Sequence, residues 1–113
     1  MCRQSMMKNI MSAFTDECRV LFGDRLNDIR LFGSYARGDF NDDSDIDVMV
    51  IVDMDYSEAR KYLERVCEIA FEIDSDSHTI ISPIIRSRRD YEIRKKLPGF
   101  YRNVETEGVS MYA

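Results

Sequence analysis

The chain has 113 residues, 44% of them hydrophobic and 33% charged, and it carries a formal net charge of −5. This composition excludes a disordered chain, and the length predicts one domain over residues 1–113, since domains commonly hold about 100 to 150 residues. The excess of acidic residues argues against direct binding of nucleic acid, because a phosphate backbone attracts positive surfaces.

The sequence predicts neither export nor membrane insertion, and we expect a cytoplasmic protein. The longest uninterrupted apolar run is Val48 to Val52, far shorter than the roughly 20 residues that span a bilayer. Residues 1–11 mix polar with apolar side chains and so lack the apolar core of a secretion signal. Cys2, Cys18 and Cys67 are an odd number without short spacing, which predicts reduced thiols. Helical periodicity predicts that the last two are buried.

Hydrophobic periodicity predicts an alternation of helices and strands along the chain. In chain order, the expected elements are a helix over about residues 5–22, strands over 29–32 and 45–52, a helix over about 57–72, a loop over 74–77, a strand over 79–85, a helix that begins after Ser87, and a helix over about 98–107. Pro83 cannot donate to a strand ladder and favours an edge position for the third strand, and Ser87 with Asp90 resembles a helix-capping pair. This order indicates an α/β or α+β fold with a small mixed sheet of about three strands flanked by helices.

Asp45 and Asp47 stand at the start of the second predicted strand. Because side chains alternate between the faces of a strand, both carboxylates are expected on one face with their Cα atoms about 7 Å apart, and apolar residues on the other. Two adjacent carboxylates repel each other and lose hydration unless a cation lies between them. Oxygen ligands of this kind favour Mg²⁺ or Mn²⁺, with phosphate and water oxygens completing the coordination. Taken alone, the pair also fits a solvated strand end.

Gly33-Ser34 follows the first predicted strand, where a short helix can begin with Ser34 as its cap. Glycine leaves room for a close backbone approach, and the free N–H groups of a helix start attract phosphate. Arg37, one turn later, would add a charge-assisted contact to the phosphate. Taken alone, each residue also fits an ordinary turn or surface position. A phosphate cradle and a metal-binding pair on adjacent strands together predict a site for a nucleoside triphosphate.

Gly33-Ser34, ten intervening residues and Asp45-x-Asp47 resemble the GS-x10-DxD motif of the DNA polymerase beta nucleotidyltransferase superfamily. The context of both motif halves is similar to the smallest branch of this superfamily, the minimal nucleotidyltransferases or MNT branch. Members of the branch are commonly paired with a HEPN-domain protein in toxin–antitoxin modules, and some transfer AMP from ATP to a tyrosine of the toxin. The segment 100–103 with Glu107-Gly108 also looks like one subgroup of these proteins.

The resemblance implies a role for each residue of the motif. Gly33 and Ser34 would hold the triphosphate of ATP or another nucleoside triphosphate, and Arg37 would contact a phosphate. Asp45 and Asp47 would be the catalytic residues and would bind Mg²⁺, with Mn²⁺ as a substitute. The expected partners are thus a nucleoside triphosphate and a HEPN-domain protein, and the sequence leaves open whether the chain forms a homo-oligomer.

The third metal-binding carboxylate of active superfamily members is not found at its expected place. The predicted strand 79–85 contains no acid, and Ser82 occupies the matching position. A hydroxyl is a far weaker Mg²⁺ ligand than a carboxylate, so catalysis is in question while nucleotide binding is still expected. Asp74 or Asp76 would have to substitute from the preceding loop, although a solvated loop explains both residues more simply.

Two further features have a chemical and a plain explanation. His78, the only histidine, would suit a catalytic base, but a surface position at a strand start explains it more simply. A basic cluster could contact RNA or an acidic partner, or it could be the solvated face of a helix; it consists of Arg86, Arg88, Arg89, Arg94, Lys95 and Lys96.

The leading hypothesis is therefore a Mg²⁺-dependent nucleotidyltransferase that transfers AMP from ATP to a protein hydroxyl, as the antitoxin of a HEPN/MNT pair. The alternative hypothesis is a nucleotide-binding antitoxin or regulatory module with weakened catalysis, which acts by binding its partner. A third hypothesis, addition of nucleotides to RNA, fits poorly because the chain is acidic and short.

Overall fold

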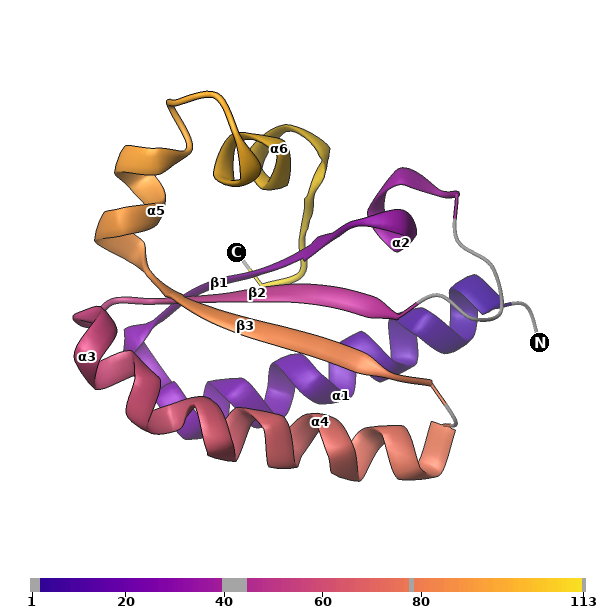
Figure 1. Ribbon diagram of the computed structural model, residues 1–113. Coiled ribbons are helices and arrows are strands. Elements are labelled where there is room, and N and C mark those ends of the chain that lie inside the picture. The colour runs from indigo at the N-terminus through magenta and orange to yellow at the C-terminus, as the bar shows by residue number, and fades with distance from the viewer. Residues whose placement is uncertain (1–2, 40–44, 78, 113) are drawn as a thin grey trace.

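The computed structural model describes residues 3–39, 45–77 and 79–112 (Figure 1). Its elements, in chain order, are α1 (Arg3–Phe22), the 3₁₀ helix η1 (Gly23–Arg25), β1 (Leu26–Phe32), α2 (Ser34–Arg37), β2 (Ile46–Val52), α3 (Tyr56–Ala59), the 3₁₀ helix η2 (Arg60–Tyr62), α4 (Leu63–Ser77), β3 (Ile81–Ser87), α5 (Arg88–Arg94), α6 (Phe100–Glu107) and β4 (Val109–Ser110). Every predicted helix and strand is present with shifted ends, and the second predicted helix is divided into α3, η2 and α4. Within the described ranges, no helix combines the length and the apolar character needed to cross a membrane.

The strands form one four-stranded mixed sheet in the order β3-β2-β1-β4. Strand β1 pairs antiparallel with both β2 and β4, whereas β2 and β3 are parallel. This sheet confirms the predicted fold class. It has one strand more than expected; β4 was not predicted because its two residues are too few to show a periodic pattern. Pro83 lies in the edge strand β3, as predicted, where it is paired with Val48.

Helices cover both faces of the sheet. Helices α1 and α4 lie along one face, and α5 and α6 lie on the other (Figure 1). The buried side chains of β2 alternate accordingly, since Val48 and Val50 belong to the large core next to α1 and α4, whereas Met49 and Ile51 belong to a smaller core next to α5 and α6. Both faces of β2 are therefore apolar, and Asp47 is the acidic exception within the strand.

Two local predictions around β3 are wrong. The expected loop over residues 74–77 is instead the last turn of α4. The Asp74 carboxylate accepts a hydrogen bond from the Ile81 backbone N–H at 3.0 Å, and this contact ties the end of the helix to the start of β3. Ser87 immediately precedes α5 but makes no side-chain capping hydrogen bond, so the predicted capping pair with Asp90 is not formed.

The two cysteines that the structure describes differ in their environment. Cys18 is buried as predicted, and burial, reinforced by the nearby charge of Glu17, raises the pKa of its thiol to about 12. Cys67 is exposed, so the prediction of a buried side chain is wrong for this residue. The reason is that α4 turns a neighbouring set of residues toward the core, namely Val66, Ile69 and Ala70.

A partly buried polar network ties α6 to the sheet. Arg30 of β1 donates hydrogen bonds to the backbone oxygens of Glu105 and Gly108, at 3.2 and 3.0 Å, where α6 ends. Asp28 Oδ2 lies 3.4 Å from Arg30 Nη1 and balances its charge. The hydroxyl of Tyr91 in α5 donates to the Glu105 carboxylate. These contacts join α5, α6 and β1, and they set the position of α6 relative to the end of β1.

The Tyr91 to Glu105 hydrogen bond predicts a pH-dependent part of the stability. The hydrogen bond from Tyr91 above all, and also the nearby charges of Lys95 and Arg30, hold the pKa of the Glu105 carboxyl below its usual value. A lowered pKa stabilises the fold at pH values above the unfolded pKa, and the contribution is lost as the pH falls through the folded pKa. We expect Tyr91→Phe to lower the free energy of unfolding by about 1 kcal/mol at neutral pH, since Glu105 remains partly exposed, and by less at about pH 3.

Urea unfolding of the wild type and of Tyr91→Phe at several pH values measures this difference. Tyr62→Phe is the matched control, because Tyr62 packs on Phe22 with ring centroids 5.1 Å apart and lies away from Glu105. A difference between wild type and Tyr91→Phe that stays constant from about pH 7 to about pH 3 would contradict the assignment to the Glu105 charge.

Candidate functional site

The turn after β1 is built by Gly33 and leads into α2. Gly33 has a φ of +75° and stands directly before the helix, so Gly33, and not Ser34 as predicted, is the N-cap residue. This φ lies in the left-handed region, which glycine adopts without the steric cost of a side chain. The backbone N–H groups of Arg37 and Gly38 bond to the carbonyl oxygens of Gly33 and Ser34 at 3.1 and 2.9 Å. The sequence therefore forms the strand, turn and short helix on which the phosphate hypothesis depends.

Asp47 lies against this turn because β1 and β2 pair antiparallel. Phe32, the last residue of β1, is the register partner of Asp47, so the strand end and the carboxylate are neighbours. A Cβ atom on Gly33 would collide with Asp47 Oδ2. Glycine at position 33 therefore serves two purposes, since it allows the backbone conformation and leaves space for the carboxylate.

The electrostatics of the aspartate pair favour a bound cation. Asp47 is partly buried, whereas Asp45, just before β2, is exposed. Burial raises the pKa of the Asp47 carboxyl, the negative charge of Asp45 raises it further, and the positive charge of Arg37 lowers it. The first two effects exceed the third, so the charged form of Asp47 lacks sufficient compensating positive charge. A divalent cation would supply this charge, and the oxygen donors fit Mg²⁺ or Mn²⁺.

A pocket of about 390 Å³ opens beside this turn. Its size lies in the range of small-molecule sites, which commonly hold about 300 to 1,000 Å³. The lining residues come from β1, α2, β2 and α6, and they are Phe32, Gly33, Ser34, Arg37, Asp47, Phe100, Asn103, Val104 and Glu107. Four of the five residues predicted for the site thus meet in one pocket, and Asp45 lies outside its lining.

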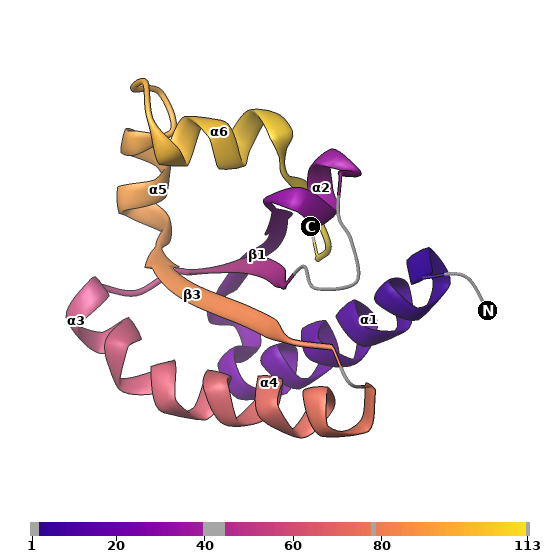
Figure 2. The same cartoon turned by 45° about the vertical axis from the view of Figure 1, so that its right-hand side comes forward.

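The wall contributed by α6 was not predicted as part of the site. Phe100, Asn103, Val104 and Glu107 follow one another at intervals of three, one and three, which places them on one face of the helix. That spacing, with the family-like segment 100–103, was the signal available in the sequence. Periodicity cannot show which strand end such a face meets, and Figure 2 shows α6 and α2 next to each other.

Arg37 stands where α2 and α6 meet. Its Nη1 lies 3.9 Å from Glu107 Oε2, and its Nε donates a hydrogen bond to Asp39 Oδ2 at 3.2 Å. The guanidinium is nearly half exposed, with 46% of the side-chain surface open to solvent, so both ion pairs are weak. A phosphate group entering the pocket would offer Arg37 a more highly charged partner than either carboxylate.

The structure places Ser82 where a third acid was expected. In the parallel pairing of β2 and β3, Ser82 is the register partner of Asp47. Asp74, from the end of α4, lies close enough to Asp45 for its pKa to be affected; burial raises the pKa of Asp74, the hydrogen bond from Ile81 lowers it, and Asp45 raises it again. Among the side chains that the structure describes, which do not include that of Asp76, no three from His, Cys, Asp or Glu are grouped to hold a metal. His78 lies outside the described residues.

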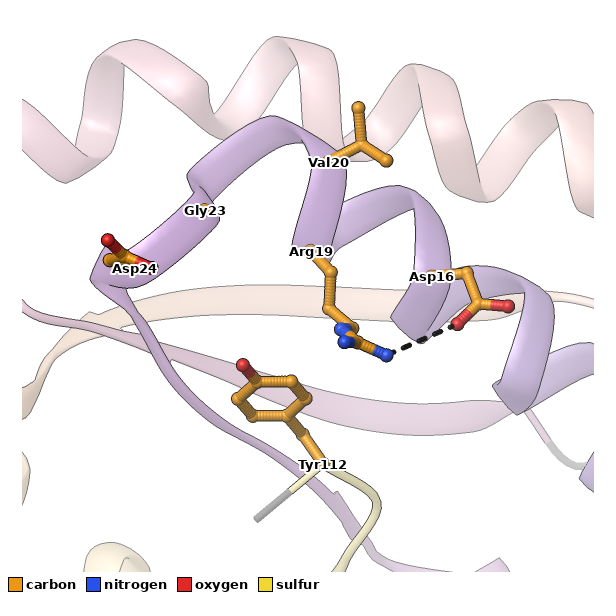
Figure 3. A pocket seen from close by; sticks show the side chains of 6 residues that line it. All are labelled: Asp16, Arg19, Val20, Gly23, Asp24 and Tyr112. Atoms are coloured by element: carbon orange, nitrogen blue, oxygen red, sulfur yellow. Dashed lines mark ion pairs between the residues drawn. The ribbon is translucent and has the colours of Figure 1, made fainter.

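A second hollow lies at the end of α1 and holds none of the predicted site residues (Figure 3). Arg19 is its most prominent group, with the guanidinium 5.6 Å from the centre of the Tyr112 ring and 4.0 Å from an oxygen of Asp16. The Arg19 guanidinium thus already has an aromatic and an acidic neighbour within the protein. Four of the five residues predicted for the site line the pocket beside Gly33, and none of the five lines this second hollow.

The family of the chain follows from comparison with known proteins. A family model described as nucleotidyltransferase domain matches residues 11–107, a segment that contains every residue of the pocket. The chain belongs to the nucleotidyltransferase domain family. Membership confirms the resemblance that the GS-x10-DxD motif indicates, and the relatives below agree with its MNT branch.

Relatives of this nucleotidyltransferase carry names of protein adenylyltransferases. A protein of Methanocaldococcus jannaschii, named as a putative protein adenylyltransferase, is 31% identical over 100 residues, which cover 88% of this chain and 91% of the relative. The protein adenylyltransferase MntA of Thermococcus cleftensis is 35% identical over 65 residues, which cover 53% of this chain and 64% of MntA. A crystal structure of a toxin–antitoxin with AMP-PNP shares the fold at a TM-score of 0.53 and 20% identity, covering 94% of this chain and 73% of the other.

Proposed function

We propose that this nucleotidyltransferase is Mg²⁺-dependent and transfers AMP from ATP to a hydroxyl group of a partner protein. The observation that carries the proposal is the single pocket in which the Gly33 turn, Arg37 and the Asp47 carboxylate meet. The names of the relatives support adenylyl transfer to a protein. The resemblance to the MNT branch supports a HEPN-domain toxin as the partner, with this chain as its antitoxin.

The proposal assigns a chemical role to each residue predicted for the site and to the α6 wall. The turn at Gly33 and Ser34 and the guanidinium of Arg37 bind the phosphates, because backbone N–H groups and a cation both attract anionic oxygens. Asp47, together with Asp45 from outside the lining, would hold Mg²⁺, which would supply positive charge to stabilise the attacked phosphate and the leaving pyrophosphate. The α6 wall shields one side of the pocket from bulk water, which strengthens these electrostatic contacts.

The proposed reaction is a substitution at the α-phosphorus of ATP. A hydroxyl oxygen of the partner forms a bond to this phosphorus while the bond to the oxygen that bridges to the β-phosphate breaks. Pyrophosphate leaves, and the proton of the hydroxyl passes to solvent. The chain supplies the phosphate and metal ligands, and the partner supplies the acceptor.

Position-specific labelling of ATP tests this proposal. The chain is incubated with Mg²⁺, its co-encoded partner and ATP that is labelled either on the α- or on the γ-phosphorus. We expect the α-label to appear on the partner and the γ-label to leave with pyrophosphate, because the transferred group is AMP. Label from the γ-position on the partner would instead show phosphoryl transfer and would contradict the proposal.

The alternative function, an antitoxin that acts by binding alone, is favoured by the position of Ser82. With Ser82 beside Asp47, β3 contributes no third carboxylate to a metal site. Under this alternative, no label from either position reaches the partner, yet the chain still protects cells from the toxin. Protection that requires ATP turnover would exclude it.

A further inference from the structure

The pocket has two chemically different halves. One half carries the phosphate-binding turn and the Asp47 carboxylate, while the other is the face of α6 with Phe100, Asn103 and Val104. An aromatic ring has little to offer a triphosphate but suits a heterocyclic base, and an amide can form hydrogen bonds to the edge of such a base. The second half of the pocket therefore needs a separate explanation.

Phe100 presents a firmly held aromatic ring. Half of its surface is exposed, so the ring can be reached from solvent. Its ring meets that of Phe32 at 82° with centroids 5.4 Å apart, and that of Tyr101 at 46° with centroids 5.8 Å apart. Two ring contacts hold its orientation, and the rest of its surface stays open for a flat ligand to stack upon.

Asn103 lies one turn after Phe100 on the same face of α6. The residue is exposed, its backbone N–H bonds to the Gly99 oxygen at 3.1 Å, and no hydrogen bond joins its side-chain amide to the described parts of the chain. An amide combines a donor and an acceptor. Adenine offers an amino group beside a ring nitrogen, a pattern that asparagine matches with two hydrogen bonds, whereas guanine has an oxygen where adenine has the amino group.

Helix α6 is also fixed relative to the phosphate half of the pocket. Arg30 of β1 holds the last carbonyl groups of the helix, and the same strand ends at Phe32, directly before the turn at Gly33. The hydrogen bonds of Arg30 thus tie the end of α6 to the strand that leads into the Gly33 turn, and such fixed positions favour a preorganised site.

We propose that α6 is the nucleobase subsite of the pocket, in which Phe100 stacks on the base and Asn103 selects adenine. This inference rests on the proposed function, since it takes the triphosphate to lie at the Gly33 turn. It deepens that function by assigning the preference for an adenine nucleotide to two residues that lie outside the GS-x10-DxD motif.

Calorimetry with ATP, GTP and inorganic tripolyphosphate, each with Mg²⁺, separates the two subsites. The wild type should bind ATP more tightly than GTP. Phe100→Ala should weaken both nucleotides by about 5- to 150-fold, because stacking accepts any base, and should leave tripolyphosphate unchanged. Asn103→Asp should reduce the ratio of ATP to GTP affinity by roughly tenfold, because a carboxylate has no donor for the ring nitrogen of adenine.

Matched variants control for exposure and charge. Ile93→Ala removes an equally exposed apolar side chain from α5, outside the pocket, and Thr106→Asp adds a negative charge to α6 at an exposed position outside the lining. Both should leave all three affinities unchanged. Phe100→Leu keeps an apolar side chain and serves where Phe100→Ala fails to fold, with the same expected loss of nucleotide stacking.

The outcomes distinguish failure of the subsite from failure of the proposed function. Equal affinity of the wild type for ATP and tripolyphosphate would overturn the base subsite while the phosphate site stands. Absence of binding for all three ligands would remove both proposals. Unchanged nucleotide binding in Phe100→Ala together with loss of partner binding would assign Phe100 to a protein interface and overturn the inference.

Discussion

Replacing Asp45 and Asp47 together by asparagine is expected to abolish transfer of the α-label to the partner while preserving the fold. Asparagine keeps the shape of aspartate but carries no charge, so the metal loses both anionic ligands. Loss of such electrostatic stabilisation commonly costs about 100-fold or more in rate. Because burial and mutual repulsion raise the pKa of Asp47, neutral side chains should leave the free energy of unfolding equal or higher.

The measurement combines the labelling assay with thermal unfolding of the double variant. Asp53→Asn is the matched control, because Asp53 is exposed and follows the opposite end of β2. It should transfer label at the wild-type rate. Label that persists in the double variant would remove both aspartates from the mechanism, and a double variant that still neutralises the toxin would favour the function by binding alone.

Gly33→Ala is expected to have the second-largest effect, with loss of both ATP binding and transfer. The residue combines a φ of +75° with a ψ of −153°, a region that residues with a side chain enter at a cost of about 1 to 3 kcal/mol, and the new Cβ would also collide with Asp47 Oδ2. The carboxylate can relieve the collision only by moving away from the turn. We therefore expect ATP affinity to fall at least tenfold, beyond the effect on stability, as measured by calorimetry and urea unfolding.

Gly23→Ala separates the two parts of this effect. Gly23 has a φ of +59°, and no heavy atom within 4 Å would meet an added Cβ. The control variant should thus show the cost of a side chain at a positive φ without a collision, and its ATP affinity should be unchanged. Equal ATP affinities of the Gly33→Ala and Gly23→Ala variants would contradict the proposed fit between the turn and Asp47.

Local patterns in the sequence predicted most of the fold. The stripe of apolar residues in α1 and the apolar run of β2 have the periods of a helix and a strand, and both elements appear where expected. The errors fall where contacts distant in sequence decide the outcome. The last turn of α4 depends on the Asp74 to Ile81 hydrogen bond, and β4 forms only by pairing with Arg30 and Leu31 of β1.

In the candidate site, too, some residues follow from local sequence patterns and others only from contacts distant in sequence. Gly33, Ser34, Arg37 and Asp47 could be singled out because they lie within one short segment, and adjacent antiparallel strands bring the two ends of that segment together. Ser82, singled out from the position of the third acid in active superfamily members, is the register partner of Asp47.

By itself, the sequence determined the family and brought Gly33, Ser34, Arg37 and Asp47 forward as site residues, since both depend on one short segment and on the backbone periodicity of its strands. Only the tertiary structure showed that the face of α6 forms the other half. Arg30 sets the position of that face: it lies on a strand about 75 residues earlier in the chain and donates hydrogen bonds to backbone oxygens at the end of α6. Helical spacing shows that Phe100 and Asn103 share a face, but packing against β1 decides what that face meets.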